Sequence, residues 1–192
     1  KGILQRLLAF EELLETGALD PAEVTLVQIA TPSRERIEHY KKTRSQVEAA
    51  VGRINGSFSQ LGKPVVHYQH RSIDKKVLRL LYRLADIMLV TPFKDGMNLV
   101  AKEYAACHDD AKGALVLSEF AGAADELPEA NLCNPFDIES VKRSLLTAIK
   151  GLEDQPEVMA ERMQIMHEQV MTHDVKLWSR AFLDSLKEAK RK

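Results

Sequence analysis

The residues best suited to chemistry stand in one short run, residues 95–103, which reads Asp-Gly-Met-Asn-Leu-Val-Ala-Lys-Glu. An apolar stretch at 87–90 predicts a strand before it, and the run itself opens a helix that reaches about Cys107. A glycine turn and a helix N-terminus both present backbone N–H groups, and the helix start favours negative charge. The acid at the end of the run can accept hydrogen bonds from ribose hydroxyls. The run therefore predicts a site for a sugar nucleotide.

The two carboxylates of this run each have an ordinary explanation beside a functional one. Asp95 precedes Gly96, which is common in turns, but it also follows the carboxyl end of a strand, where ligands gather in α/β folds. Glu103 lies four residues after Leu99, on the same helix face and roughly 6 Å further along the axis. That rise is close to the step from a diphosphate to its ribose. The alternative for Glu103 is an exposed acid beside Lys102; we expect an inward position and a ligand role.

Other candidate motifs are fewer and weaker. A loop of small residues at 121–124, centred on Gly122, follows the next expected strand; its backbone could approach a ligand, or it could be a simple tight turn. The six histidines and two cysteines show no metal-ligand spacing. Dinucleotide, Walker and nucleophile-elbow motifs are also absent from the sequence, which argues against hydride transfer and ATP hydrolysis by those devices.

The composition indicates a globular protein that fits one domain of ordinary size. The 192 residues are 45% hydrophobic and 29% charged, and the net charge of -1 gives no electrostatic footprint for nucleic acid. We expect no membrane span and no signal peptide, and we interpret Cys107 and Cys133 as reduced thiols of a cytoplasmic protein. The sequence starts at Lys1 with helical spacing from Ile3, so we expect a fragment of a longer chain. A homo-oligomer is compatible with the composition.

The elements that must position the run alternate along the chain. We expect strands at 24–30, 64–68, 87–90, 114–117 and 131–133, the first of them buried on both faces. We expect helices at 3–15, from Pro32 to a break at Asn55-Gly56, at 75–84 after an Asp74 cap, and at 98–107, 138–150, 157–171 and 175–188. This alternation predicts an α/β fold, a Rossmann-like parallel sheet with helices on both faces.

Several segments resemble one enzyme family. They are LVTPFKDGMNLVAKEYAA at 89–106, LVLSEFAGAADEL at 115–127, VQIATPSRERIEHY at 27–40 and GRINGSF at 52–58. Through them the chain is similar to the trehalose-6-phosphate synthase family over essentially its whole length. The resemblance implies the C-terminal, nucleotide-sugar-binding half of a GT-B glycosyltransferase. That family transfers glucose from a nucleoside-diphosphate glucose, usually UDP-glucose, to glucose 6-phosphate, with retention of configuration and without a metal ion or other cofactor.

The resemblance implies a donor site made mostly by the run at 95–103. Asp95 would bind glucose hydroxyls and Glu103 the ribose. Backbone amides between them would hold sugar and phosphate, namely those of Gly96, Met97, Asn98, Leu99 and Val100. The backbone at Ile73 matches the base-contacting position, where relatives often carry an aromatic residue, so UDP-, ADP- and GDP-glucose stay open. Lys1-Gly2 resembles the end of an R-x-D-Y-x-K-G motif whose cations neutralise the diphosphate, which makes Lys1 and Asp95 the expected catalytic residues.

The resemblance also divides the chain and implies a partner domain. Residues 1–173 would form the donor-binding domain, and 174–192 a last helix that either crosses to the N-terminal domain or packs on its own. That N-terminal domain, absent from this chain, would supply most of the glucose 6-phosphate site, so we expect the isolated chain to be inactive. Two alternatives stay open: a non-catalytic regulatory module of a trehalose-synthesising complex, and a GT-B transferase with another acceptor, such as a glycogen or sucrose synthase relative.

Overall fold

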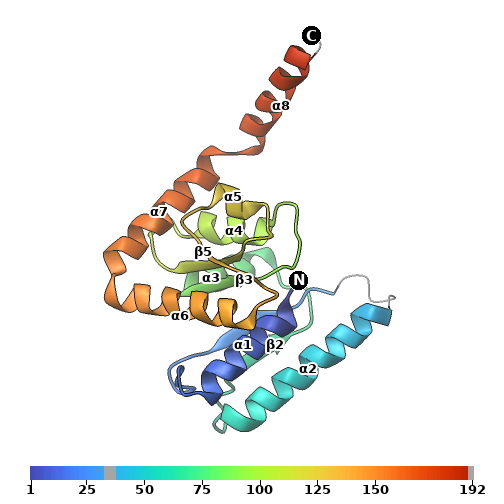
Figure 1. Ribbon diagram of the computed structural model, residues 1–192, viewed down its shortest axis with the longest axis vertical. Coiled ribbons are helices and arrows are strands. Elements are labelled where there is room, and N and C mark those ends of the chain that lie inside the picture. Colours follow the sequence, from blue (N-terminus) through green and yellow to red (C-terminus); the bar gives the residue numbers. More distant parts are fainter. Residues whose placement is uncertain (33–37, 190–192) are drawn as a thin grey trace.

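The computed structural model describes residues 1–32 and 38–189 and confirms the expected alternation of strands and helices (Figure 1). The strands are β1 (Leu26–Ile29), β2 (Val66–Gln69), β3 (Ile87–Val90), β4 (Ala114–Ser118) and β5 (Asn131–Cys133). The helices are α1 (Ile3–Glu15), α2 (Glu38–Phe58), α3 (Lys75–Leu84), α4 (Leu99–Cys107), α5 (Ala123–Glu126), α6 (Ile138–Asp154), α7 (Pro156–Thr172) and α8 (Val175–Ala189). Among the helices of the described ranges, none combines the length and the apolar character needed to cross a membrane.

All ladders between the strands are parallel, as the alternation predicts, but they form two sheets instead of one. β1 pairs with β2, with Leu26 opposite Val66. β3, β4 and β5 form the second sheet in that order, with Ile87 opposite Ala114. Within residues 1–32 and 38–189 no ladder joins β1 to β3. A groove of about 1860 Å³, which we call the inter-sheet groove, is lined by both of these strands and by the start of α1.

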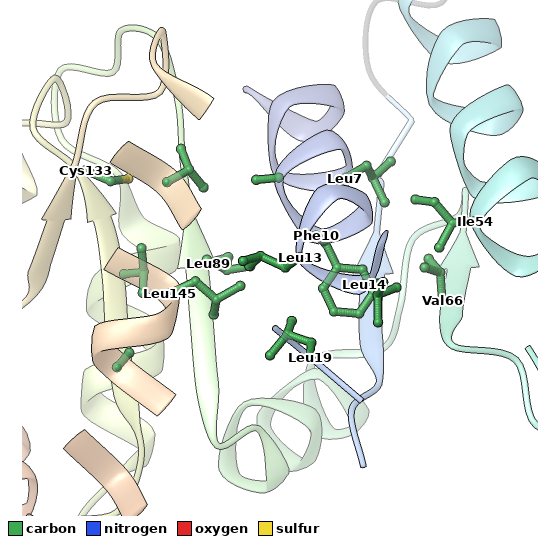
Figure 2. Close-up of a cluster of buried hydrophobic side chains, with 14 of the residues drawn as sticks. Leu7, Phe10, Leu13, Leu14, Leu19, Ile54, Val66, Leu89, Cys133 and Leu145 are labelled. Atoms are coloured by element: carbon green, nitrogen blue, oxygen red, sulfur yellow. The ribbon is translucent and has the colours of Figure 1, made fainter. Parts of the chain in front are cut away.

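Helix α1 links the two sheets through its apolar face. Its inward side chains recur three and four residues apart and are at most 5% exposed: Leu7, Phe10, Leu13 and Leu14. Figure 2 shows them between Leu89 of β3 on one side and Ile54 of α2 and Val66 of β2 on the other. Burying a side chain of this size stabilises the fold by about 1.5–3 kcal/mol relative to exposure. Helix α1 therefore contributes much of the apolar contact that joins the two sheets.

Two expectations about the first sheet are wrong. The helix expected to break at Asn55 continues to Phe58, because the Asn55 side chain is used elsewhere: its Oδ1 accepts from the Val66 amide (2.8 Å) and its Nδ2 donates to the Val66 carbonyl (2.9 Å). β1 is not buried on both faces, since Val27 is 50% exposed in a strand paired on one edge only. Residues 33–37, where that helix was expected to begin, lie outside the described part of the chain.

The last helix, α8, projects away from the rest of the molecule (Figure 1). Four of its apolar side chains form a stripe and are between 43% and 64% exposed: Trp178, Phe182, Leu183 and Leu186. The rings of Trp178 and Phe182 stack on each other, with centroids 5.4 Å apart. Within the described residues α8 therefore does not pack on the rest of this chain, and its crossing to another domain stays a prediction.

Candidate functional site

Asp95 lies in the loop between β3 and α4 (residues 91–98, the Asp95 loop), beyond the carboxyl end of a parallel strand. One of its carboxylate oxygens accepts from the Met97 amide and the other from Nδ2 of Asn98, both at 3.2 Å. These bonds are the ordinary turn chemistry of an aspartate, and they also fix the orientation of the carboxylate. Each oxygen keeps a lone pair, so a half-buried, oriented acceptor remains available to sugar hydroxyls.

Asn98 ends the Asp95 loop and caps α4. Its backbone has φ 80°, a left-handed conformation that asparagine tolerates better than most residues, and its Oδ1 accepts from the Ala101 amide at 3.0 Å. The helix therefore begins at Leu99, one residue later than expected. Among the described residues, none accepts a hydrogen bond from the amides of Leu99 and Val100. Two N–H groups at the positive end of the helix are thus left for an anionic ligand.

The loop between β4 and α5 (residues 119–122, the Gly122 loop) braces the Asp95 loop. Asp95 N donates to Phe120 O (3.2 Å), Gly122 N to Asp95 O (3.0 Å), and Ala123 N to Met97 O (2.7 Å). A Cβ on Gly122 would lie 2.3 Å from the carbonyl oxygen of Gly96, so only glycine fits there. Contact between two loops therefore explains Gly122, whereas the same test places nothing within 4 Å of Gly96, whose exposed backbone is open.

Glu103 lies just over one turn into α4 and is exposed, so the expected inward position is wrong. The side of α4 that meets the core is a different one, and it carries the buried residues Tyr104 and Ala105. Glu103 instead lines the inter-sheet groove together with Asn98 and Val100. An exposed carboxylate on a groove is better placed for a ligand than a buried one, because no desolvation has to be offset before binding.

Lys1 is held beside the carboxyl end of β3 by its neighbour Gly2. Gly2 has φ 66°, its carbonyl accepts from Thr91 Oγ1 at 3.1 Å, and a Cβ there would lie 1.8 Å from the Thr91 carbonyl oxygen. This docking places Lys1 on the same groove as Asn98 and Glu103. The structure thus places on one groove the predicted cation Lys1, the predicted ribose acid Glu103 and Asn98, whose amide is one of the predicted donor contacts.

Arg6 is a second cation on the groove, and the sequence analysis missed it because its position on α1 is that of any helical residue. Its guanidinium donates to Leu89 O (2.8 Å) and to Lys1 O (3.1 Å), while Nε is buried without a hydrogen-bond partner among the described residues. Burial lowers the pKa of Arg6 to about 10, which still leaves it charged at neutral pH. Its carbonyl contacts provide no compensating negative charge, so positive potential is retained near Lys1.

Five predicted site residues lie outside the lining of the inter-sheet groove: Asp95, Gly96, Met97 and Leu99 in or next to the Asp95 loop, and Ile73 in another segment. Ile73 is half-buried in the segment between β2 and α3, next to the Asp74 cap, and it is not a lining residue of the inter-sheet groove, although His70 and Leu78 are. Across residues 1–32 and 38–189, no cluster of three His, Cys, Asp or Glu side chains is arranged to hold a metal ion. The charged groups of the groove at its site end include Lys1, Arg6 and Glu103, whereas Asp95 lies outside its lining.

This arrangement defines a parallel α/β domain with an anion-and-hydroxyl site at the carboxyl ends of its strands. The sequence model of glycosyltransferase family 20 matches residues 1–188, and the chain belongs to that family. A trehalose-6-phosphate synthase of Mycolicibacterium vanbaalenii is 54% identical over 186 residues, which cover 97% of this chain and 37% of that relative. One from Mycobacterium leprae is 52% identical over 189 residues, with 98% and 37% covered.

Solved structures of similar proteins confirm the expected fold class. A structure of the E. coli protein described as bound with UDP-2-fluoro glucose is 40% identical and matches with a TM-score of 0.90 over 97% of this chain and 41% of that one. An α,α-trehalose-phosphate synthase (UDP-forming) of Burkholderia xenovorans in complex with glucose-6-phosphate is also 40% identical, with a TM-score of 0.89 over 97% and 41%. The chain thus spans well under half the length of the relatives that it matches.

Proposed function

We propose that residues 1–192 form the donor-binding part of a retaining glycosyltransferase that makes trehalose 6-phosphate. One observation carries the proposal: among the described residues the amides of Leu99 and Val100 have no acceptor, and Val100 lines the same groove as Lys1 and Glu103. Support comes from the 54% identity to a trehalose-6-phosphate synthase and from the similar structure described as bound with UDP-2-fluoro glucose. The donor is a nucleoside-diphosphate glucose, with UDP-glucose first and ADP- or GDP-glucose as alternatives.

In this proposal each part of the donor meets a different group. The carboxylate of Asp95 accepts from glucose hydroxyls, with the amides of Gly96, Met97 and Asn98 nearby, and the free amides of Leu99 and Val100 donate to phosphate. Lys1 and Arg6 supply positive charge for the diphosphate, and Glu103 accepts from the ribose hydroxyls. Ile73 contacts the base through its backbone, which requires the nucleotide to reach beyond the groove toward the segment before α3.

The proposed chemistry depends on stabilising a leaving group. The bond between the anomeric carbon and the diphosphate oxygen breaks, and the acceptor hydroxyl oxygen bonds to that carbon on the same face. The departing phosphate oxygen takes the acceptor's proton. Because negative charge grows on the diphosphate, amides and cations already fixed around it lower the barrier, and this is commonly the largest catalytic contribution. Lys1 and the Asp95 loop are therefore the catalytic elements of this chain.

The acceptor, glucose 6-phosphate, would bind mostly through an N-terminal domain outside these 192 residues. Residues 1–173 are the donor-binding domain of the proposal, and 174–192 form a helix that crosses to that other domain. The exposed apolar stripe of α8 supports this division, because such a stripe is stabilised when another surface covers it. Residues 1–192 alone should then bind the donor but complete no transfer.

Calorimetric titration of residues 1–192 with UDP, ADP and GDP tests donor binding, and an assay of trehalose 6-phosphate formation tests the division of labour. We expect binding of at least one nucleotide, weakened more than tenfold by Lys1→Ala, and no product from UDP-glucose and glucose 6-phosphate. Absence of binding to all three nucleotides would instead favour a non-catalytic regulatory module. Substantial turnover by these residues alone would overturn the assignment of the acceptor site to another domain.

A further inference from the structure

Tyr82, on the last turn of α3, contacts α4 through both its side chain and its backbone. Its hydroxyl donates to Oε2 of Glu103 at 3.3 Å, and its backbone carbonyl accepts from Nε2 of His108, the residue that caps the end of α4, at 2.9 Å. The tyrosine is only 8% exposed, whereas Glu103 is exposed. A buried, packed side chain therefore contacts an exposed one directly at the groove.

The surroundings of Tyr82 fix its position firmly. His108 is buried and its ring packs on that of Tyr104, with centroids 4.4 Å apart. Tyr104 in turn donates to the carbonyl oxygen of Ala85 at 2.9 Å, just beyond the end of α3. These contacts hold the last turn of α3 against α4 without involving Glu103. The Tyr82 hydroxyl is thus the member of this contact that points at the candidate ribose acid.

The phenol of Tyr82 acts only as a donor to Glu103. Burial, and next the negative charge of Glu103, raise the pKa of Tyr82 well above its ordinary value, so its proton stays in place at any physiological pH. A glutamate at an exposed helix position otherwise moves among many rotamers, and fixing it on binding has an entropic cost. One hydrogen bond from a rigid donor reduces that cost and leaves Oε1 free.

We propose that Tyr82 is a positioning residue that holds the carboxylate of Glu103 in the orientation that accepts hydrogen bonds from the ribose hydroxyls of the donor. This role rests on the proposed function, because it requires that Glu103 bind ribose. Tyr82 touches no part of the reacting sugar in this arrangement. Its loss should therefore weaken nucleotide binding and the preference for ribose, and leave the rate of transfer from bound donor nearly unchanged.

The test compares Tyr82→Phe with Tyr104→Phe in the natural protein that carries these residues. Both variants remove one hydroxyl from the contact between α3 and α4, but only the first removes the bond to Glu103. The measurements are the affinities for UDP and for 2′,3′-dideoxyuridine diphosphate, together with KM and kcat for UDP-glucose. We expect Tyr82→Phe to weaken UDP binding roughly three- to tenfold, as for the loss of one ordinary hydrogen bond, because the bond acts on the nucleotide only through Glu103. The affinity for the dideoxy nucleotide and kcat should change less than twofold.

Several outcomes separate this role from a structural one. If Tyr104→Phe weakens UDP as much as Tyr82→Phe does, or if Tyr82→Phe weakens both nucleotides equally, the positioning role is overturned. In a Glu103→Ala background, Tyr82→Phe should cause no further loss, and a further loss above twofold would also overturn it. Failure of the unchanged protein to bind UDP, ADP or GDP would reject the proposed function itself, and the role of Tyr82 with it.

Discussion

The Asp95 loop and the β1–β2 sheet differ in how their conformations are fixed. The Asp95 loop is held within its own neighbourhood, by three backbone hydrogen bonds to the Gly122 loop and its α5 start and by the Asn98 cap. The first sheet, which has two strands in the described residues, is held to the second through α1. The two hydrogen bonds between Asn55 of α2 and Val66 fix β2 against α2. The comparison indicates that the chemistry of the site depends on loop-to-loop contacts of the second sheet, and the stability of the molecule on the docking of the first.

Leu13→Ala should produce the largest loss of stability, because this side chain is 3% exposed in the cluster that links the sheets. A cavity there lowers the free energy of unfolding by about 2–5 kcal/mol. Urea denaturation measures it, and nucleotide affinity well below the transition should remain within twofold. A loss under about 1 kcal/mol would show that α1 is not the main link.

Gly122→Ala should damage the site most. The new methyl would press on the Gly96 carbonyl, and overpacking of this kind costs about 1–3 kcal/mol. Because the two loops must separate, the amides of the Asp95 loop move, and we expect UDP affinity to fall more than tenfold in calorimetry. Gly52→Ala is the matched control: it lies inside α2, nothing stands within 4 Å of its added Cβ, and it should stabilise by about 0.5–1 kcal/mol without affecting binding.

Asn55→Ala tests from the side of the first sheet whether stability and nucleotide binding depend on different regions. It removes the two hydrogen bonds to Val66 and a third from the Ser59 hydroxyl, and it leaves the amide and carbonyl of Val66 without their Asn55 partner, which should cost about 1–3 kcal/mol of unfolding free energy. Nucleotide affinity should remain within twofold, as for Leu13→Ala. An affinity loss as large as that of Gly122→Ala would mean that the two regions are not separable.

Raising the pH should produce the smallest of the expected changes in the free energy of unfolding. Burial raises the pKa of the Cys133 thiol in β5 to about 11, above its value in the unfolded chain. Between these two pKa values the unfolded state releases a proton that the folded state keeps. The stabilisation contributed by this thiol is therefore fully present below about pH 9 and is lost as the pH rises toward 11. Unfolding free energies measured between pH 8 and pH 10 should fall by about 1 kcal/mol from this group. Cys133→Ala should reduce that slope, and an unchanged slope would assign the effect elsewhere.

The sequence predicted those features that depend on neighbouring residues. The bounds of β3, the Asp74 cap of α3 and the turn at Asp95-Gly96 are local, and each has a residue type that only a few conformations suit. The fold class followed from the alternation of strands and helices. The donor-site roles stay predictions, although the structure places most of their residues on or beside one groove.

What the sequence did not predict arises between segments that meet only in space. The Asn55-Gly56 pair predicted a helix break. The helix continues because the Asn55 side chain bonds to the backbone of Val66, eleven residues away, and this contact cannot be read from neighbouring residues. For Gly122 the sequence left open a close approach to a ligand or a simple tight turn, whereas the close neighbour is the Gly96 carbonyl of another loop. The exposure of Glu103 depends on which face of α4 meets the core, and its contact with Tyr82 joins two helices.

The open edges of β1 and β3 have a consequence for the behaviour of these residues in concentrated solution. Over the described residues, each strand has a ladder partner on one side only, and both line the inter-sheet groove. An unpaired edge is a template on which any extended apolar segment can add a strand, including one from a neighbouring copy. We therefore expect strand addition at these edges to be the route by which copies of these residues associate at high concentration, and a peptide strand that occupies the groove should reduce that association.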